Sequence, residues 1–182
     1  MKGIVFTEFV EMVEEAFGLD TADDLLEGTE LASGGVYTAV GTYEFAELVA
    51  LVAGLSERTG QPVPALLHAF GQHLFGRFVL AYPQFFEGVP GALAFLENVE
   101  GYIHPEVLKL YPDAELPRFE TRRDGSGLEM VYRSPRRLGD FAAGLVQGCL
   151  AHFGEERPIE REDRPDGSVR FLIRAPVVSG QA

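Results

Sequence analysis

The chain has 182 residues, of which 46% are hydrophobic and 24% charged, and its net charge is −13. This size and composition predict one globular unit, or two tightly packed subdomains, with a core large enough to enclose a ligand. The excess of acidic residues argues against nucleic acid and against anionic membranes as partners, because phosphate binding needs clustered Lys and Arg. Cys149 is the single cysteine, which excludes an internal disulfide and a cysteine-rich zinc site and fits a reducing compartment.

The N-terminal residues show no targeting signal. Glu8, Glu11 and Glu14 interrupt any signal-peptide core. No apolar run approaches the roughly 18 residues that a transmembrane helix needs. We therefore expect a cytoplasmic protein.

Apolar residues recur at helical spacing through much of the first hundred residues. Helices are predicted over residues 3–17, 21–27, 43–59 and 62–82 and from about 90 toward His104, with a loop over 29–41 and a turn over 83–90. Gly18 and Gly60 are suited to end the first and third helices. Gly101 and Pro105 are expected to perturb the last one.

The pattern changes after Pro112. Strands are predicted over residues 118–123, 128–134, 155–161 and 168–175, and a helix over 136–153. The order ββαββ predicts one four-stranded antiparallel sheet with a helix on it. The predicted class is therefore α+β, a single domain over residues 1–182 with a helical N-terminal subdomain over about 1–60 and an α/β subdomain over about 61–182.

His104 follows an apolar helix in the segment Tyr102-Ile103-His104-Pro105. A neutral imidazole in an apolar setting can bind iron axially, as in many haem proteins. The alternative is a histidine at a helix end that hydrogen-bonds a neighbour. The residues alone leave both interpretations open.

Tyr132, Ser134 and Arg136 are spaced by two, so an extended segment places them on one face. A phenol, a hydroxyl and a guanidinium fork together suit one or two carboxylates of a ligand. The alternative is a strand edge that leads into a helix, with Ser134 as N-cap and Pro135 at the first helical position. The two interpretations are compatible.

The remaining polar residues give weaker signals. His68, His73 and His152 are expected at the surface or at helix ends, and no paired carboxylates, phosphate loop or nucleophile elbow is present. We therefore expect a binding or sensing protein rather than an enzyme.

Three features together carry a family resemblance. They are the start Met1-Lys2-Gly3-Ile4-Val5, His104 with the downstream Lys109-Leu110-Tyr111-Pro112-Asp113-Ala114-Glu115-Leu116-Pro117, and Tyr132-x-Ser134-x-Arg136. The chain resembles the H-NOX family, the haem-nitric oxide/oxygen binding domain related to the haem region of soluble guanylate cyclase. The resemblance extends from Met1 to about Arg174. Some relatives carry a cysteine-rich zinc site, which this chain lacks the cysteines to form.

The resemblance implies haem b between the two subdomains, with His104 as the axial ligand of its iron. It implies that Tyr132, Ser134 and Arg136 bind the propionates and that Pro117 presses on the haem. Val5 and Phe9 are expected to contact the macrocycle.

The distal side decides which gas binds. Oxygen-binding members place a tyrosine hydroxyl there, and the matching position here is Phe141, with Leu74, Phe78 and Leu145 beside it. A donor contributes about 1.5–3 kcal/mol to bound dioxygen, whereas nitric oxide needs it far less. We therefore expect nitric oxide and carbon monoxide to bind and oxygen to be excluded, unless Tyr43 or Tyr82 reaches the pocket.

The resemblance also implies a mechanism. Nitric oxide binds the ferrous iron, the His104 bond breaks, and a conformational change signals to a partner, a histidine kinase or a cyclic-di-GMP enzyme. Two alternatives belong to other classes: an oxygen-binding or haem-redox enzyme, and a haem-free domain that binds a carboxylate ligand.

Overall fold

The computed structural model describes residues 1–176, so residues 177–182 of the predicted single domain lie outside the described part. The helices are α1 (Gly3–Phe17), α2 (Leu19–Gly28), α3 (Phe45–Thr59), α4 (Val63–Ala81), α5 (Ala92–Glu97), α6 (His104–Leu110) and α7 (Gly139–His152). The strands are β1 (Arg118–Asp124), β2 (Gly127–Arg133), β3 (Ile159–Asp163) and β4 (Val169–Ile173). A 3₁₀ turn, η1 (Pro83–Phe85), follows α4, and a π-helix, η2 (Val99–Ile103), precedes α6. Within the described part, no helix combines the length and apolar character needed to cross a bilayer.

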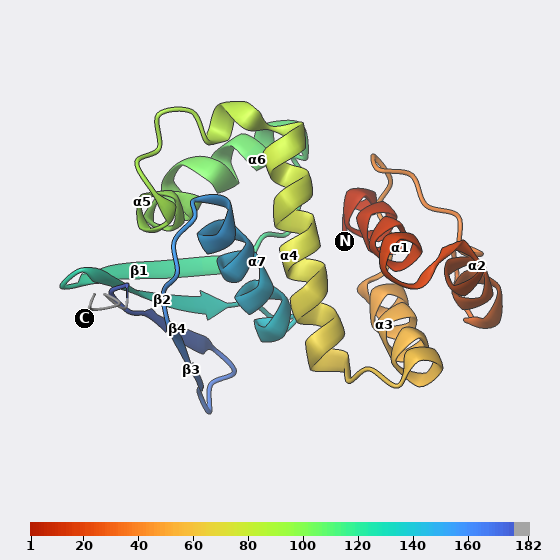
Figure 1. Ribbon diagram of the computed structural model, residues 1–182. Helices are drawn as coiled ribbons and strands as arrows, with labels where there is room; N and C mark the ends of the chain where they lie inside the picture. The colour runs from red at the N-terminus through yellow and green to blue at the C-terminus, as the bar shows by residue number, and fades with distance from the viewer. Residues whose placement is uncertain (177–182) are drawn as a thin grey trace.

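Helix α4 stands between two groups of elements (Figure 1). On one side lie α1, α2 and α3, whose apolar faces form a core with Leu66, Phe70 and Leu74 of α4. On the other side lie the sheet and α5, α6 and α7. The second core fills the space between the sheet and the helices α5 and α7. The α+β class predicted from the sequence is confirmed.

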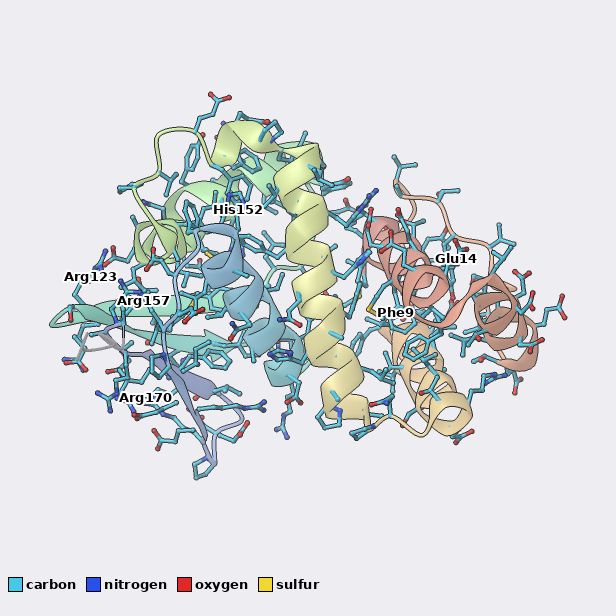
Figure 2. All side chains as sticks on the ribbon, in the orientation of Figure 1. Phe9, Glu14, Arg123, His152, Arg157 and Arg170 are labelled. Atoms are coloured by element: carbon cyan, nitrogen blue, oxygen red, sulfur yellow. The ribbon has the colours of Figure 1, made fainter. Side chains whose placement is uncertain are left out.

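The four strands form one antiparallel sheet in the order β1-β2-β4-β3. Alternation along β2 sends Met130 and Tyr132 into the second core and Glu129 to the outer face. On that outer face Glu129 pairs with Arg122 and Arg170, and Figure 2 shows Arg170 on this side of the sheet. The sheet is thus apolar where it faces the helices and charged where it faces solvent.

Helices α4 and α7 cross with almost no space between their backbones. A β-carbon on Gly144 of α7 would lie 2.0 Å from the carbonyl oxygen of His68 on α4. Only glycine permits such an approach, because any side chain would keep the two helices apart. The close crossing fixes α4 and α7 relative to each other, and residues of both helices line the cavity described below.

Most predicted elements form where expected, and the differences have local causes. The last N-terminal helix ends at Glu97, and His104 begins a separate helix, α6, with Pro105 in its first turn. Helix α7 starts at Gly139 rather than 136, because the preceding residues form a turn in which Arg137 has φ +52°. Strand β3 starts at Ile159 rather than 155. Glu155 instead accepts a hydrogen bond from the first backbone N–H of α5, that of Ala92, at 2.7 Å.

Candidate functional site

A cavity of about 600 Å³ lies between α4, α7, the η2–α6 segment and the start of α1. Its volume is in the range of ligand and cofactor sites. Its walls are mostly aliphatic and aromatic, and its polar residues gather at one end. That end is lined by Lys2, Thr42, Glu44, Asp113, Glu115, Ser134 and Arg136. The cavity therefore suits a large apolar ligand with an anionic edge.

His104 lines this cavity as the first residue of α6. Its side chain is 14% exposed, and its Nδ1 atom lies 3.2 Å from Oε1 of Glu100, within hydrogen-bonding distance. Burial lowers the pKa of the imidazole, although Glu100 acts in the opposite direction. With Nδ1 engaged, a neutral ring has its Nε2 lone pair available for a metal. His104 thus lies beside the Glu100 carboxylate and lines the cavity, and its role as an iron ligand remains a prediction.

Glu100 was not identified from the sequence, although it stands four residues before His104. The same Oε1 atom accepts the backbone N–H of Phe119 at 2.6 Å. The Phe119 ring lies 5.8 Å from the His104 ring, between centroids, and also lines the cavity. Spacing by four on a helix was the available signal.

Tyr132, Ser134 and Arg136 come together at the polar end of the cavity. The Tyr132 hydroxyl accepts the backbone N–H of Leu138 at 3.1 Å, and burial raises the pKa of this tyrosine. Ser134 Oγ accepts the backbone N–H of Arg136 at 3.2 Å. The N-cap interpretation of Ser134 is wrong, because α7 begins at Gly139.

The Arg136 guanidinium holds a carboxylate in this structure. Its Nη1 donates to the Glu115 carbonyl at 2.8 Å and its Nη2 to the Glu115 carboxylate at 2.5 Å. The Glu115 side chain is 80% exposed, so solvent can replace it at little cost. The fork is therefore placed and oriented to bind a carboxylate at the cavity mouth.

The segment between α6 and β1, which contains Pro117, lies at the polar end of the cavity. Pro117 lines the cavity, and Asp113 pairs with Lys2 at 2.9 Å between Oδ1 and Nζ. Lys2 also donates to Thr42 at 3.0 Å. The segment after α6 is thereby tied to the start of α1.

The opposite wall is apolar. Leu74 and Phe78 come from α4, and Phe141 and Leu145 come from α7. Val5 of α1 also lines the cavity. Among these five residues none offers a hydrogen-bond donor from its side chain.

Tyr43 and Tyr82 are the two tyrosines that the sequence offers as hydroxyl donors to this wall. Tyr43 lines the cavity, but its hydroxyl accepts the backbone N–H of Thr38 at 2.9 Å. Tyr82 is absent from the cavity lining of the described residues. Burial and a hydrogen bond with Tyr111 raise the pKa of Tyr82 to about 12.

Phe9 is not among the residues that line the cavity, and its expected contact with the macrocycle remains a prediction. Its side chain is fully buried in the N-terminal core, and its ring packs edge-on against Phe70 with centroids 5.2 Å apart. Figure 2 shows Phe9 among the N-terminal helices. The physical reason is the helical phase: Val5 and Phe9 stand four apart on α1, but the packing against α3 and α4 takes Phe9 inward and leaves Val5 at the cavity.

The His104 imidazole, the apolar walls and the carboxylate-binding mouth together fit a flat apolar macrocycle with a metal at its centre and acidic groups on its edge. Fold and site together define a domain that can enclose a large apolar ligand with an acidic edge. The sequence profile of the family described as Haem-NO-binding matches residues 2–161. The chain belongs to this family, H-NOX, whose members bind haem and act as gas sensors, and this confirms the resemblance found in the sequence.

Solved H-NOX structures match almost the whole chain. The unliganded Fe(II) protein from K. algicida is 37% identical, with a TM-score of 0.90 and 100% of both chains covered. The Shewanella woodyi protein, solved in its Fe(II)CO state, is 37% identical, with a TM-score of 0.83 and coverage of 100% and 97%. The S. oneidensis protein in its Fe(II)NO state is 27% identical, with a TM-score of 0.88 and coverage of 96% and 98%. No curated protein gives a significant match.

Proposed function

We propose that this chain is a nitric oxide sensor that holds haem b through His104. The observation that carries the proposal is His104 itself. It is the one imidazole on the lining of the cavity in the described residues, and its Nδ1 atom is engaged so that Nε2 remains for iron. The sensor domains of this family are generally not catalytic, and we propose no reaction.

The residues of the mouth orient the cofactor. Arg136 would exchange the Glu115 carboxylate for a haem propionate, while Tyr132 and Ser134 offer hydroxyls beside it. Pro117 is rigid and lines the same cavity, so it would press on the ring edge. The bound haem would supply an iron with an open position for a diatomic gas.

The apolar wall selects the gas. Phe141, Leu145, Leu74 and Phe78 give bound dioxygen no hydrogen bond, which withholds about 1.5–3 kcal/mol of stabilisation. The Tyr43 hydroxyl is engaged with the backbone of Thr38. We therefore propose that nitric oxide and carbon monoxide bind and that oxygen does not.

With haem bound, release of His104 from the iron would begin the response. His104 stands at the junction of η2 and α6, and the segment after α6 is tied to Lys2 through Asp113. Movement of α6 would therefore reach the start of α1, and residues 1–60 would shift against residues 61–182. We propose these two ranges as the moving units, in a cytoplasmic protein whose partner is a histidine kinase or a cyclic-di-GMP enzyme.

Haem titration of the apoprotein tests the proposal. The wild-type protein should take up one haem and show the absorption of a histidine-ligated ferrous iron after reduction. His104→Gly should lose this spectrum, and added imidazole should restore it. His68→Ala removes another imidazole, which is absent from the cavity lining, and should behave as wild type. Equal spectra from wild type and His104→Gly would rule out His104 as the ligand.

A further inference from the structure

We propose that Glu100 is a positioning residue for the axial ligand. Its carboxylate accepts the Nδ1 proton of His104, determines which ring nitrogen faces the cavity, and sets how firmly His104 holds the metal. The proposal rests on the proposed function, since it assumes that His104 binds haem iron.

The geometry starts with the π-helix η2. Glu100 lies on η2, and His104 is the residue that directly follows it. The spacing of four residues brings both side chains to one face, with Glu100 Oε1 3.2 Å from His104 Nδ1. π-Turns are often found at functional sites. Here the π-turn determines how the His104 side chain is oriented relative to the Glu100 carboxylate.

A second contact fixes the carboxylate. The backbone N–H of Phe119 donates to the same Oε1 atom at 2.6 Å, and Phe119 belongs to β1. Glu100 therefore links three elements: its own π-helix, the start of α6 and an edge strand of the sheet. An anchored acceptor holds the ring in one orientation, which a freely rotating surface carboxylate does not.

The two side chains differ in exposure, and this matters for the chemistry. His104 is 14% exposed and Glu100 40% exposed. The imidazole is thus shielded from water that would otherwise compete for its Nδ1 proton. The charge of the carboxylate remains solvated, so its burial costs little.

The consequence follows from the acceptor's charge. A carboxylate that accepts the Nδ1 proton of a metal-bound histidine raises the basicity of the ligand and strengthens its bond to the metal. A sensor that releases this histidine must break the stronger bond. Glu100 therefore slows the release of His104 and sets the amount of gas binding energy that a response requires.

Three variants test the proposal in the haem-loaded protein. Glu100→Gln keeps an acceptor oxygen but removes the negative charge. Glu100→Ala removes both the acceptor oxygen and the charge. Glu106→Gln is the matched control, because Glu106 lies on α6 but pairs with Lys109. The iron–histidine stretching frequency of the ferrous protein, measured by resonance Raman, should fall from wild type to Glu100→Gln to Glu100→Ala and stay unchanged in the control.

The rate of His104 release after mixing with nitric oxide is the second readout. It should rise about tenfold in Glu100→Ala, the lower end of what loss of such a partner costs at metal sites. Equal frequencies and equal rates in wild type and Glu100→Ala would overturn the proposal.

A third measurement separates this proposal from the proposed function. In the haem-free protein, the ¹⁵N shifts of His104 should show Nδ1 protonated in wild type and a mixture of tautomers in Glu100→Ala. If the wild-type protein took up no haem, the proposed function would fail, and the role of Glu100 at the iron would fail with it. If haem bound through His104 but neither tautomer nor frequency changed, only the role of Glu100 would be refuted.

Discussion

Replacing Gly144 with alanine should destabilise the fold strongly, because the β-carbon would lie 2.0 Å from the His68 carbonyl oxygen. Ordinary contact begins at 3.4 Å, so α4 and α7 would have to separate by about 1.4 Å, the difference between the two distances. The atom in the way belongs to a helix backbone and cannot rotate aside. Leu145, the next residue on α7, lines the cavity, so the change would also widen the site.

The expected magnitude combines two opposing effects. Overpacking against a rigid neighbour costs up to about 3 kcal/mol, and alanine in place of a helical glycine returns about 1 kcal/mol. The net loss is about 2 kcal/mol, which corresponds to a drop in Tm of about 4–8 °C for a chain of this size.

Gly76→Ala is the matched control, because Gly76 lies on α4 with no atom within 4 Å of the added β-carbon. It should gain up to about 1 kcal/mol from helix propensity alone. Urea unfolding followed by circular dichroism measures both variants. If Gly144→Ala were as stable as Gly76→Ala, the close crossing of α4 and α7 would be wrong.

Three further changes test the site and the sheet. Phe141→Tyr places a hydroxyl in the apolar wall, so the reduced variant should form an oxygen complex in air that the wild type does not form; absorption spectra without such a complex would contradict the reasoning about the wall. Arg136→Ala removes a charge-assisted bond of about 1.5 kcal/mol, so haem should transfer to an acceptor globin about tenfold faster, and an unchanged transfer rate would exclude Arg136 from propionate binding. Glu129 has its pKa lowered from 4.5 to about 2 by hydrogen bonds from Arg170 and Arg122. Because the folded pKa is the lower one, its stabilising contribution is complete above about pH 4.5 and is lost as the pH falls toward 2. Glu129→Gln should therefore lose less stability than wild type between pH 6 and pH 2.5 in urea titrations, and parallel losses would contradict the ion-pair assignment.

Much of the fold was predictable because its signals are local. The apolar spacing of α1 gave its full extent over residues 3–17, and Gly60 ends α3 with a left-handed backbone of φ +70° as its position suggested. One turn separates the strands of each predicted hairpin, and both hairpins form. The late start of β3 was not predictable, since it depends on the contact between Glu155 and the start of α5.

The site was predictable where residues adjacent in sequence share a face. The triplet Tyr132, Ser134 and Arg136 shows this, because alternation in an extended segment was sufficient to group them. The spacing could not separate Val5, which lines the cavity, from Phe9, which packs against Phe70, because it does not say which part of a helix face meets the core. Glu100 was missed although it stands four residues before His104, and its second contact, with Phe119 on β1, comes from a distant element that only the folded chain brings close.

The most direct test of the central claim is the absorption spectrum of the purified, reduced protein, recorded alone, in air and with nitric oxide. The predicted result is a five-coordinate ferrous haem that does not bind oxygen. Its bond to His104 should break when nitric oxide is added. A stable oxygen complex would contradict the apolar wall as the basis of selectivity. The absence of any haem bands would contradict the sensor function itself.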